Sequence, residues 1–298
     1  MDVPAFRWFV GIDWSGAKGE VHRGIAVAIC SHGEAPPEVV APPSAKRGWS
    51  RVECAQWLRE LAQDGPVLAG IDFAFAHAYL DAGGYYPDVA GAPHSPAALW
   101  AMIDAANSDK PDLYGGGLWA HKDFGPFYNA PGQRGEKFTS RRRLTEIQAA
   151  SVRSPSPTFN CVGPAGVGTG SLAGMRFLHH MQDIAAIWPF QRPSGALTLV
   201  EIFPSYYFAM AGIRPVNGQH GQAKILNQAL AHFDTQPMPE GFPADGPDAD
   251  QADAVIASAA LRALANDEGC WSAAEAAAME AARQEGWIFG VKSAKDEG

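Results

Sequence analysis

Three apolar stretches of the chain each contain one acidic residue. The acids are Asp13, Asp72 and Glu201, within Phe-Val-Gly-Ile-Asp-Trp-Ser-Gly, Val-Leu-Ala-Gly-Ile-Asp-Phe-Ala and Leu-Thr-Leu-Val-Glu-Ile-Phe-Pro. A charge in apolar surroundings is costly unless it has a partner. Three such stretches with one acid apiece therefore predict that these acids share one site.

A fourth acidic motif, Asp-Ala-Asp-Gln-Ala-Asp-Ala, lies at 248–254. Its Asp250 and Asp253 are three residues apart, so their side chains are neighbours if the segment is helical. Ala254 and Ala257 follow close to the same face, and their small side chains let the helix approach a sheet closely. We expect this helix to bring one or both aspartates to the strand acids.

Carboxylates that share a site need a positive partner, because two like charges about 4 Å apart cost about 4 kcal/mol at an effective dielectric of 20. Oxygen ligands favour Mg²⁺ or Mn²⁺, and the motifs contain no His or Cys that would favour zinc. Two such ions about 3.5–4 Å apart can activate a water and stabilise the leaving oxygen of a phosphoryl group. The acids therefore predict a metal-dependent phosphodiester hydrolase, with Asp13, Asp72, Glu201 and Asp253 as catalytic metal ligands and Asp250 as a further ligand.

Each acid also has a structural interpretation. A strand-end aspartate often serves a turn, and Asp250 and Asp253 would suit the cap and first turn of a helix. Glu201 fits such an interpretation least, because four apolar residues flank it.

The elements that must position these acids follow from periodicity and turn residues. Apolar runs predict strands at 9–13, 24–29 and 36–41 and within 67–74 and 197–204, and the short turn after the first makes the second antiparallel to it. Ser50 and Glu53 predict a capping box that opens a helix through Leu61. Further helices are expected near 95–106, 140–151, 171–187, 205–211, 219–232, 250–265 and 273–284, with a short final strand at 286–291. Strands and helices in this order predict an α/β fold.

Between about 77 and 193 the periodicity fails, and Gly, Pro, aromatic and polar residues mix. We interpret the chain as one domain, 1–298, with this segment as a large insertion after the fourth strand. The net charge of −9 repels polyanions, so any contact with nucleic acid requires a local basic patch. The four cysteines lie far apart and are expected as reduced core residues.

No charged segment leads into a long apolar run of the signal-peptide type, and no apolar run approaches the roughly 18 residues of a membrane helix. We therefore expect a cytoplasmic protein with no membrane partner. The sequence leaves its oligomeric state open.

Three further features predict contacts with a phosphate. Gly168, Thr169, Gly170 and Ser171 precede a helix-like stretch, where backbone N–H groups and hydroxyls can face an anion. The run Arg141, Arg142 and Arg143 follows several aromatic residues, a combination that can hold phosphates and stack bases. Lys18 lies five residues after Asp13, where it would meet a scissile phosphate. A plain glycine turn, a solvated helix face and an exposed turn lysine are the structural alternatives.

The order of the motifs resembles the ribonuclease H-like superfamily, and more closely the family catalogued as domain of unknown function 429, whose members are predicted nucleases of that fold. The residues that carry the resemblance are Gly11-Ile12-Asp13, Gly70-Ile71-Asp72-Phe73, Val200-Glu201-Ile202-Phe203-Pro204 and Asp250-Gln251-Ala252-Asp253-Ala254, with the segments 167–171 and 285–290. The ending Asp-x-x-Asp-Ala also resembles that of Holliday-junction resolvases.

The resemblance covers most of the chain. It implies a mixed five-stranded sheet in the order 3-2-1-4-5 with helices on both faces. It also implies metal ligation at Asp13, Asp72 and Asp253, with Glu201 and Asp250 as further ligands. The expected partner is nucleic acid or another phosphoester.

Two other functions are compatible with the sequence. One is a non-catalytic binding protein of the same fold that keeps the acids for stability. The other is an actin-like ATP-dependent phosphotransferase, because Gly11-Ile12-Asp13 followed by Ser15-Gly16 suits a first phosphate loop. Against the latter, the chain is short for two such domains and shows no second phosphate loop at the matching position.

Overall fold

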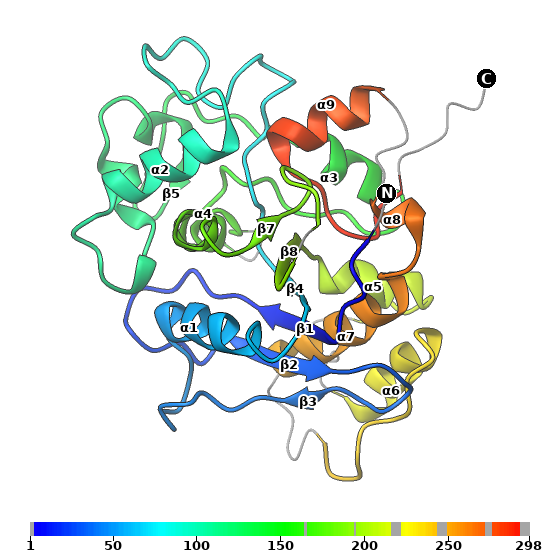
Figure 1. Ribbon diagram of the computed structural model, residues 1–298. Coiled ribbons are helices and arrows are strands. Elements are labelled where there is room, and N and C mark those ends of the chain that lie inside the picture. The colour runs from blue at the N-terminus through cyan, green and yellow to red at the C-terminus, as the bar shows by residue number, and fades with distance from the viewer. Residues whose placement is uncertain are drawn as a thin grey trace.

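A mixed β-sheet forms the centre of the computed structural model, which describes residues 3–163, 166–193, 195–215, 222–242, 249–271 and 276–292 (Figure 1). Its six strands are β1 (Trp8–Asp13), β2 (Ala26–Cys30), β3 (Glu38–Val39), β4 (Val67–Ile71), β7 (Ala186–Ile187) and β8 (Leu197–Glu201). They lie in the order β3-β2-β1-β4-β8-β7. β2 is antiparallel to β1 and β3, whereas β1, β4, β8 and β7 run parallel.

The α/β prediction is confirmed, and the expected strand order matches the first five positions of the sheet. The sheet has one strand more than expected, because the two-residue edge strand β7 pairs with β8 at the end of the predicted insertion. The expected final strand at 286–291 is replaced by a single bridge between Ile288 and Glu201.

The helices cover both faces of the sheet. They are α1 (Arg51–Leu61), α2 (Pro96–Ala106), α3 (Leu144–Ala149), α4 (Gly168–Met181), α5 (Pro204–Met210), α6 (Ala223–His232), α7 (Ala249–Leu264), α8 (Glu268–Trp271) and α9 (Ala276–Glu285). The capping box of α1 is present, since the Ser50 hydroxyl accepts from the Glu53 N–H at 3.0 Å and the Glu53 carboxylate accepts from the Ser50 N–H at 3.5 Å. α3 is shorter than predicted, α4 begins and ends earlier, and α8 was not expected.

The two faces of the sheet belong to separate cores. Phe9, Leu68 and Val200 pack on the side of α5, α6 and α7. The alternate residues of the strands, such as Val10 and Leu199, pack on the side of α1, α2 and α4. Figure 1 shows α7 and α1 on opposite sides of β1 and β2. All four cysteines are buried and unbonded, as predicted.

The segment 77–193 contains α2, α3 and α4, and also short elements that the sequence did not indicate. These are the 3₁₀ turns η1 (Pro111–Leu113), η2 (Gly116–Ala120) and η3 (Gly125–Phe127), and the hairpin of β5 (Asn129–Ala130) and β6 (Gln133–Arg134). Among the residues that the structure describes, no helix combines the length and apolar character that crossing a membrane requires.

Gly11 lets α7 lie directly on β1. A Cβ atom at Gly11 would meet the Ala254 carbonyl oxygen and lie 2.6 Å from the Ser258 nitrogen. The Ser258 hydroxyl donates to the Phe9 carbonyl oxygen at 2.8 Å, which fixes the helix along the strand. The N-terminal end of α7 therefore lies beside the carboxyl end of β1.

Candidate active site

Asp13 and Asp72 occupy adjacent positions at one edge of the sheet. Asp13 ends β1 and Asp72 follows β4; these strands are parallel, with Ile12 opposite Ile71, and the Asp72 N–H donates to the Ile12 carbonyl oxygen at 2.9 Å. Because side chains alternate along a strand, both acids lie on the face of Phe9, which α7 covers. The carboxyl edge of parallel strands is where α/β proteins bind ligands.

α7 adds two more carboxylates to this edge. Burial raises the pKa of Asp13 well above its usual value, and the negative charges of Asp253, Asp72 and Asp250 raise it further. Burial likewise raises the pKa of Asp253, and Asp72 and Asp250 add to this effect. Asp250 lies beside the turn after β1, since its Oδ2 and the Ser15 Oγ are each 3.6 Å from the position of a Cβ on Gly24. The structure thus brings together four of the five predicted acids.

The carboxylate oxygens of these four aspartates are suitable ligands for a divalent cation, but the side chains do not form a complete coordination site. All four are half-buried, and within the described part of the chain neither Asp13 nor Asp72 forms an ion pair with arginine or lysine. As the side chains lie, the described residues include no group of three or more His, Cys, Asp or Glu positioned to hold a metal ion.

Burial, assisted by the charge of Glu201, raises the pKa of Asp72 to about 7. A carboxyl group with such a pKa exchanges its proton near neutral pH. A cation would compete with that proton, because metal ligands must be deprotonated.

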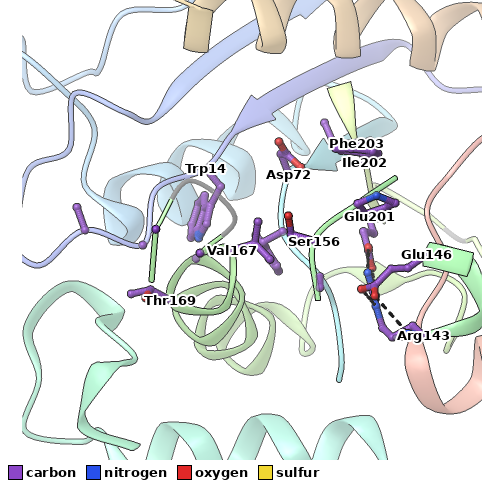
Figure 2. Close-up of a pocket in the computed structure, with 18 of the residues that line it drawn as sticks. Trp14, Asp72, Arg143, Glu146, Ser156, Val167, Thr169, Glu201, Ile202 and Phe203 are labelled. Atoms are coloured by element: carbon purple, nitrogen blue, oxygen red, sulfur yellow. Dashed lines mark hydrogen bonds and ion pairs between the residues drawn. The ribbon is translucent and has the colours of Figure 1, made fainter. Parts of the chain in front are cut away.

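Glu201 belongs to an ion pair instead of the aspartate cluster. It lies opposite Ile71 in β4, so its side chain projects to the face opposite Asp13 and Asp72. Its oxygens accept from Arg143 Nη1 at 2.7 Å and Nη2 at 2.5 Å, and from the Phe75 N–H at 3.0 Å. Arg143 Nε also donates to Glu146 at 2.7 Å. Figure 2 shows these three charged side chains together, apart from Asp72.

The arginine run is used inside the protein. Arg141 donates to Asp81 and to the carbonyl oxygens of three nearby residues, Ala78, Gly84 and Tyr85. Arg142 donates to the Pro155 carbonyl oxygen at 2.7 Å. With Arg143 paired as described, the run presents no continuous cationic surface to a phosphate backbone.

A pocket of ≈ 580 Å³ lies next to the strand ends (Figure 2). Its walls come from the segments that follow β1 and β4, from the end of β8 and from segments of 77–193 that lie across the strand ends. The lining residues that matter below are Trp14, Lys18, Asp72, Tyr114, Trp119 and Gly170. Of the glycine-rich segment, Thr169 and Gly170 line the pocket.

Gly168 and Ser171 are occupied elsewhere in the glycine-rich segment. The Gly168 N–H donates to the Asn160 carbonyl oxygen at 2.8 Å. The buried Ser171 hydroxyl donates to the Val167 carbonyl oxygen at 3.1 Å and accepts from the Ala74 N–H at 3.3 Å. These two residues therefore support the pocket wall from behind.

Two groups around the site have no counterpart in the sequence prediction. The buried guanidinium of Arg51 donates to the carbonyl oxygens of Ser15, at 2.6 and 3.0 Å, and Ala17, at 2.8 Å, which anchors the turn after Asp13. Gly16 packs in that turn directly on the first turn of α4, because a Cβ there would meet the Gly170 nitrogen. The second group is Tyr114 and Trp119, two aromatic residues of the pocket lining that lie outside the predicted motifs.

Comparisons of the chain with protein-family models, with curated proteins and with solved structures found no match.

Proposed function

We propose that the protein is a metal-dependent phosphodiester hydrolase, a nuclease or phosphoesterase of ribonuclease H-like type, that uses Mg²⁺ or Mn²⁺. The observation that carries the proposal is the meeting of Asp13, Asp72, Asp250 and Asp253, from two strands and a helix, on one face at the strand ends. A cluster of half-buried carboxylates is unfavourable without a cation. The resemblance in motif order and the five shared sheet positions support the same proposal.

Asp13, Asp72 and Asp253 would hold the cation, with Asp250 beside them. When bound, the cation would polarise the phosphoryl group and lower the pKa of a water. Hydrolysis forms a bond from the water oxygen to phosphorus, breaks the bond to the leaving oxygen and transfers a proton to that oxygen. In the metal-free protein Asp72, whose pKa burial and Glu201 raise to about 7, exchanges its proton near neutral pH, and binding of the cation would displace that proton.

Glu201 has a different role in this proposal. Its ion pair with Arg143 fixes the end of β8 and the segment that follows Asp72, through the bond from the Phe75 N–H. We infer that Glu201 stabilises the structure around the site and that the aspartates are the metal ligands.

Calorimetric titration with Mn²⁺, followed by hydrolysis of bis(p-nitrophenyl) phosphate, tests the proposal. The wild-type protein should bind Mn²⁺ and turn over the diester, and Asp13→Asn should weaken binding at least tenfold and abolish turnover. Asp183→Asn is the matched control, because Asp183 is exposed and pairs with Arg59 at the surface. A wild-type protein that binds no Mn²⁺, with turnover unchanged in Asp13→Asn, would overturn the proposal in favour of a non-catalytic binding protein.

A further inference from the structure

We propose that the substrate is a nucleotide-sized phosphoester with a planar aromatic ring, and that the pocket beside the aspartates binds it. This inference rests on the proposed function for the reaction, but it concerns binding. A nucleic-acid duplex is the alternative that the test must exclude.

The size and position of the pocket favour a small molecule. Its volume of ≈ 580 Å³ lies within the range of about 300–1,000 Å³ typical of small-ligand sites. Segments around Tyr114, Trp119, Ser156 and Val167 form its walls across the strand ends. In Figure 2, Ser156 and Val167 stand between the end of β4, with Asp72, and the body of α4. A long duplex would have to pass over these walls to reach Asp72.

One side of the pocket is suited to a planar ring. Tyr114 and Trp119 are half-buried, line the pocket and meet edge to face, with ring centroids 6.2 Å apart and an interplanar angle of 85°. Stacking of a base on an aromatic side chain tolerates any base, because every base has a π-face. These two residues form the ring-binding side of the site.

The other side of the pocket is suited to a phosphate. Thr169 and Gly170, in the first turn of α4, line it together with Lys18, and N–H groups at a helix start favour anions. The independent observation is Trp14, which is 8% exposed and whose indole N–H has no acceptor among the described residues. Its Cδ1, next to that nitrogen, is 4.0 Å from the position of a Cβ on Gly170. A buried donor normally has a partner, so we infer that a ligand oxygen accepts here.

The charges around the pocket oppose a polyanion. Lys18 and Arg143 are the cationic residues of the described lining, and Arg143 is paired with Glu201 and Glu146. The whole chain carries a net charge of −9. Binding of a duplex depends on several phosphate contacts by lysine and arginine, whereas one nucleotide requires a single anion site.

Calorimetry with adenosine 5′-monophosphate, on the wild-type protein in Mg²⁺, tests the binding. Trp119→Ala should weaken the affinity about tenfold or more, the amount expected for loss of a stacking partner. Trp57→Ala, a half-buried tryptophan of α1 outside this pocket, should leave it within twofold. Lys18→Ala should lower the affinity for the nucleotide about fivefold. Lys224→Ala, which changes an exposed lysine of α6, should leave the affinity unchanged.

Gly170→Leu supplies a steric test at a position where an added Cβ meets no close contact. A Cβ at Gly170 has only ordinary contacts, 3.8 Å or more from its neighbours, so a larger side chain can extend into the pocket and block the nucleotide. Circular dichroism checks that each variant is folded. The inference would be overturned if the wild-type protein did not bind the nucleotide. It would also be overturned if Gly170→Leu and Trp119→Ala bound the nucleotide with the affinity of the wild type.

Cleavage of a dinucleoside monophosphate and of a 20-base-pair duplex separates this inference from the proposed function. Faster cleavage of the dinucleotide by about 100-fold in kcat/KM supports both. Nucleotide binding sensitive to Trp119→Ala, with no cleavage of either substrate, supports the pocket and refutes the hydrolase. Cleavage of the duplex without nucleotide binding supports the hydrolase and overturns this inference.

Discussion

Asp72 gives the metal-free protein a pH dependence of predictable sign. Its folded pKa is about 7, whereas an aspartate in an unfolded chain has a pKa of about 3.9. Between these values the folded state binds the proton that the unfolded state has released, so the free energy of unfolding falls as pH rises from about 4 to about 7, by at most about 1.4 kcal/mol per pH unit for this group. Urea unfolding in EDTA at pH 5 and pH 8 measures this, and Asp72→Asn should reduce the difference.

The same measurement with Mn²⁺ present should oppose this trend. The cation competes with protons for the carboxylates, so Mn²⁺ should stabilise the protein more at pH 8 than at pH 5. An identical pH dependence in wild type and Asp72→Asn would show that Asp72 does not titrate in this range.

Asp13 and Glu201 should respond to loss of charge in opposite directions. Asp13→Asn replaces a carboxyl group whose ionised form is disfavoured by burial and by three neighbouring aspartates, and should stabilise the metal-free protein by about 1 kcal/mol. Glu201→Gln removes one of the two buried carboxylates that pair with Arg143, and should destabilise the protein by about 3 kcal/mol. Chemical denaturation in EDTA compares the two variants, and a shift of the same sign in both would contradict their separate roles.

At the scale of elements, the seating of α7 on β1 determines whether the aspartates meet. Gly11→Ala places a methyl group against the Ala254 carbonyl oxygen and the Ser258 nitrogen. We expect a loss of about 2 kcal/mol in the free energy of unfolding and at least tenfold weaker Mn²⁺ binding, because Asp253 moves away from Asp13. Gly84→Ala is the control, since a Cβ there has no heavy atom within 4 Å. Unchanged Mn²⁺ affinity in Gly11→Ala would contradict this account.

The elements that carry Asp13 and Asp72 could be predicted because their signals are local. Apolar runs of five or six residues and the Ser50 capping box are sufficient for β1, β4 and α1. β7 has only two residues and no such signal. The place of Glu201 could not be predicted, because the face that a strand residue occupies depends on register with its neighbour, and its partner Arg143 lies 58 residues away.

At the scale of the whole molecule, metal binding and folding should be linked. A ligand that binds only the folded state at 100 times its Kd stabilises it by about 2.7 kcal/mol. Mn²⁺ at that concentration should raise the free energy of unfolding of the wild-type protein by this amount, and that of Asp13→Asn by much less. Thermal or chemical unfolding with and without Mn²⁺ measures the difference; an equal gain in both proteins would place the ion outside the aspartate cluster.

The contact at Gly16 has a mechanical consequence for both parts of the site. The turn that begins at Asp13 and the first turn of α4 meet there with no room for a methyl group, and Arg51 holds the same turn from the other side. Any displacement of α4 must therefore move Trp14 and the backbone of Asp13 with it. The carboxylates and the adjacent pocket are therefore expected to move as one unit.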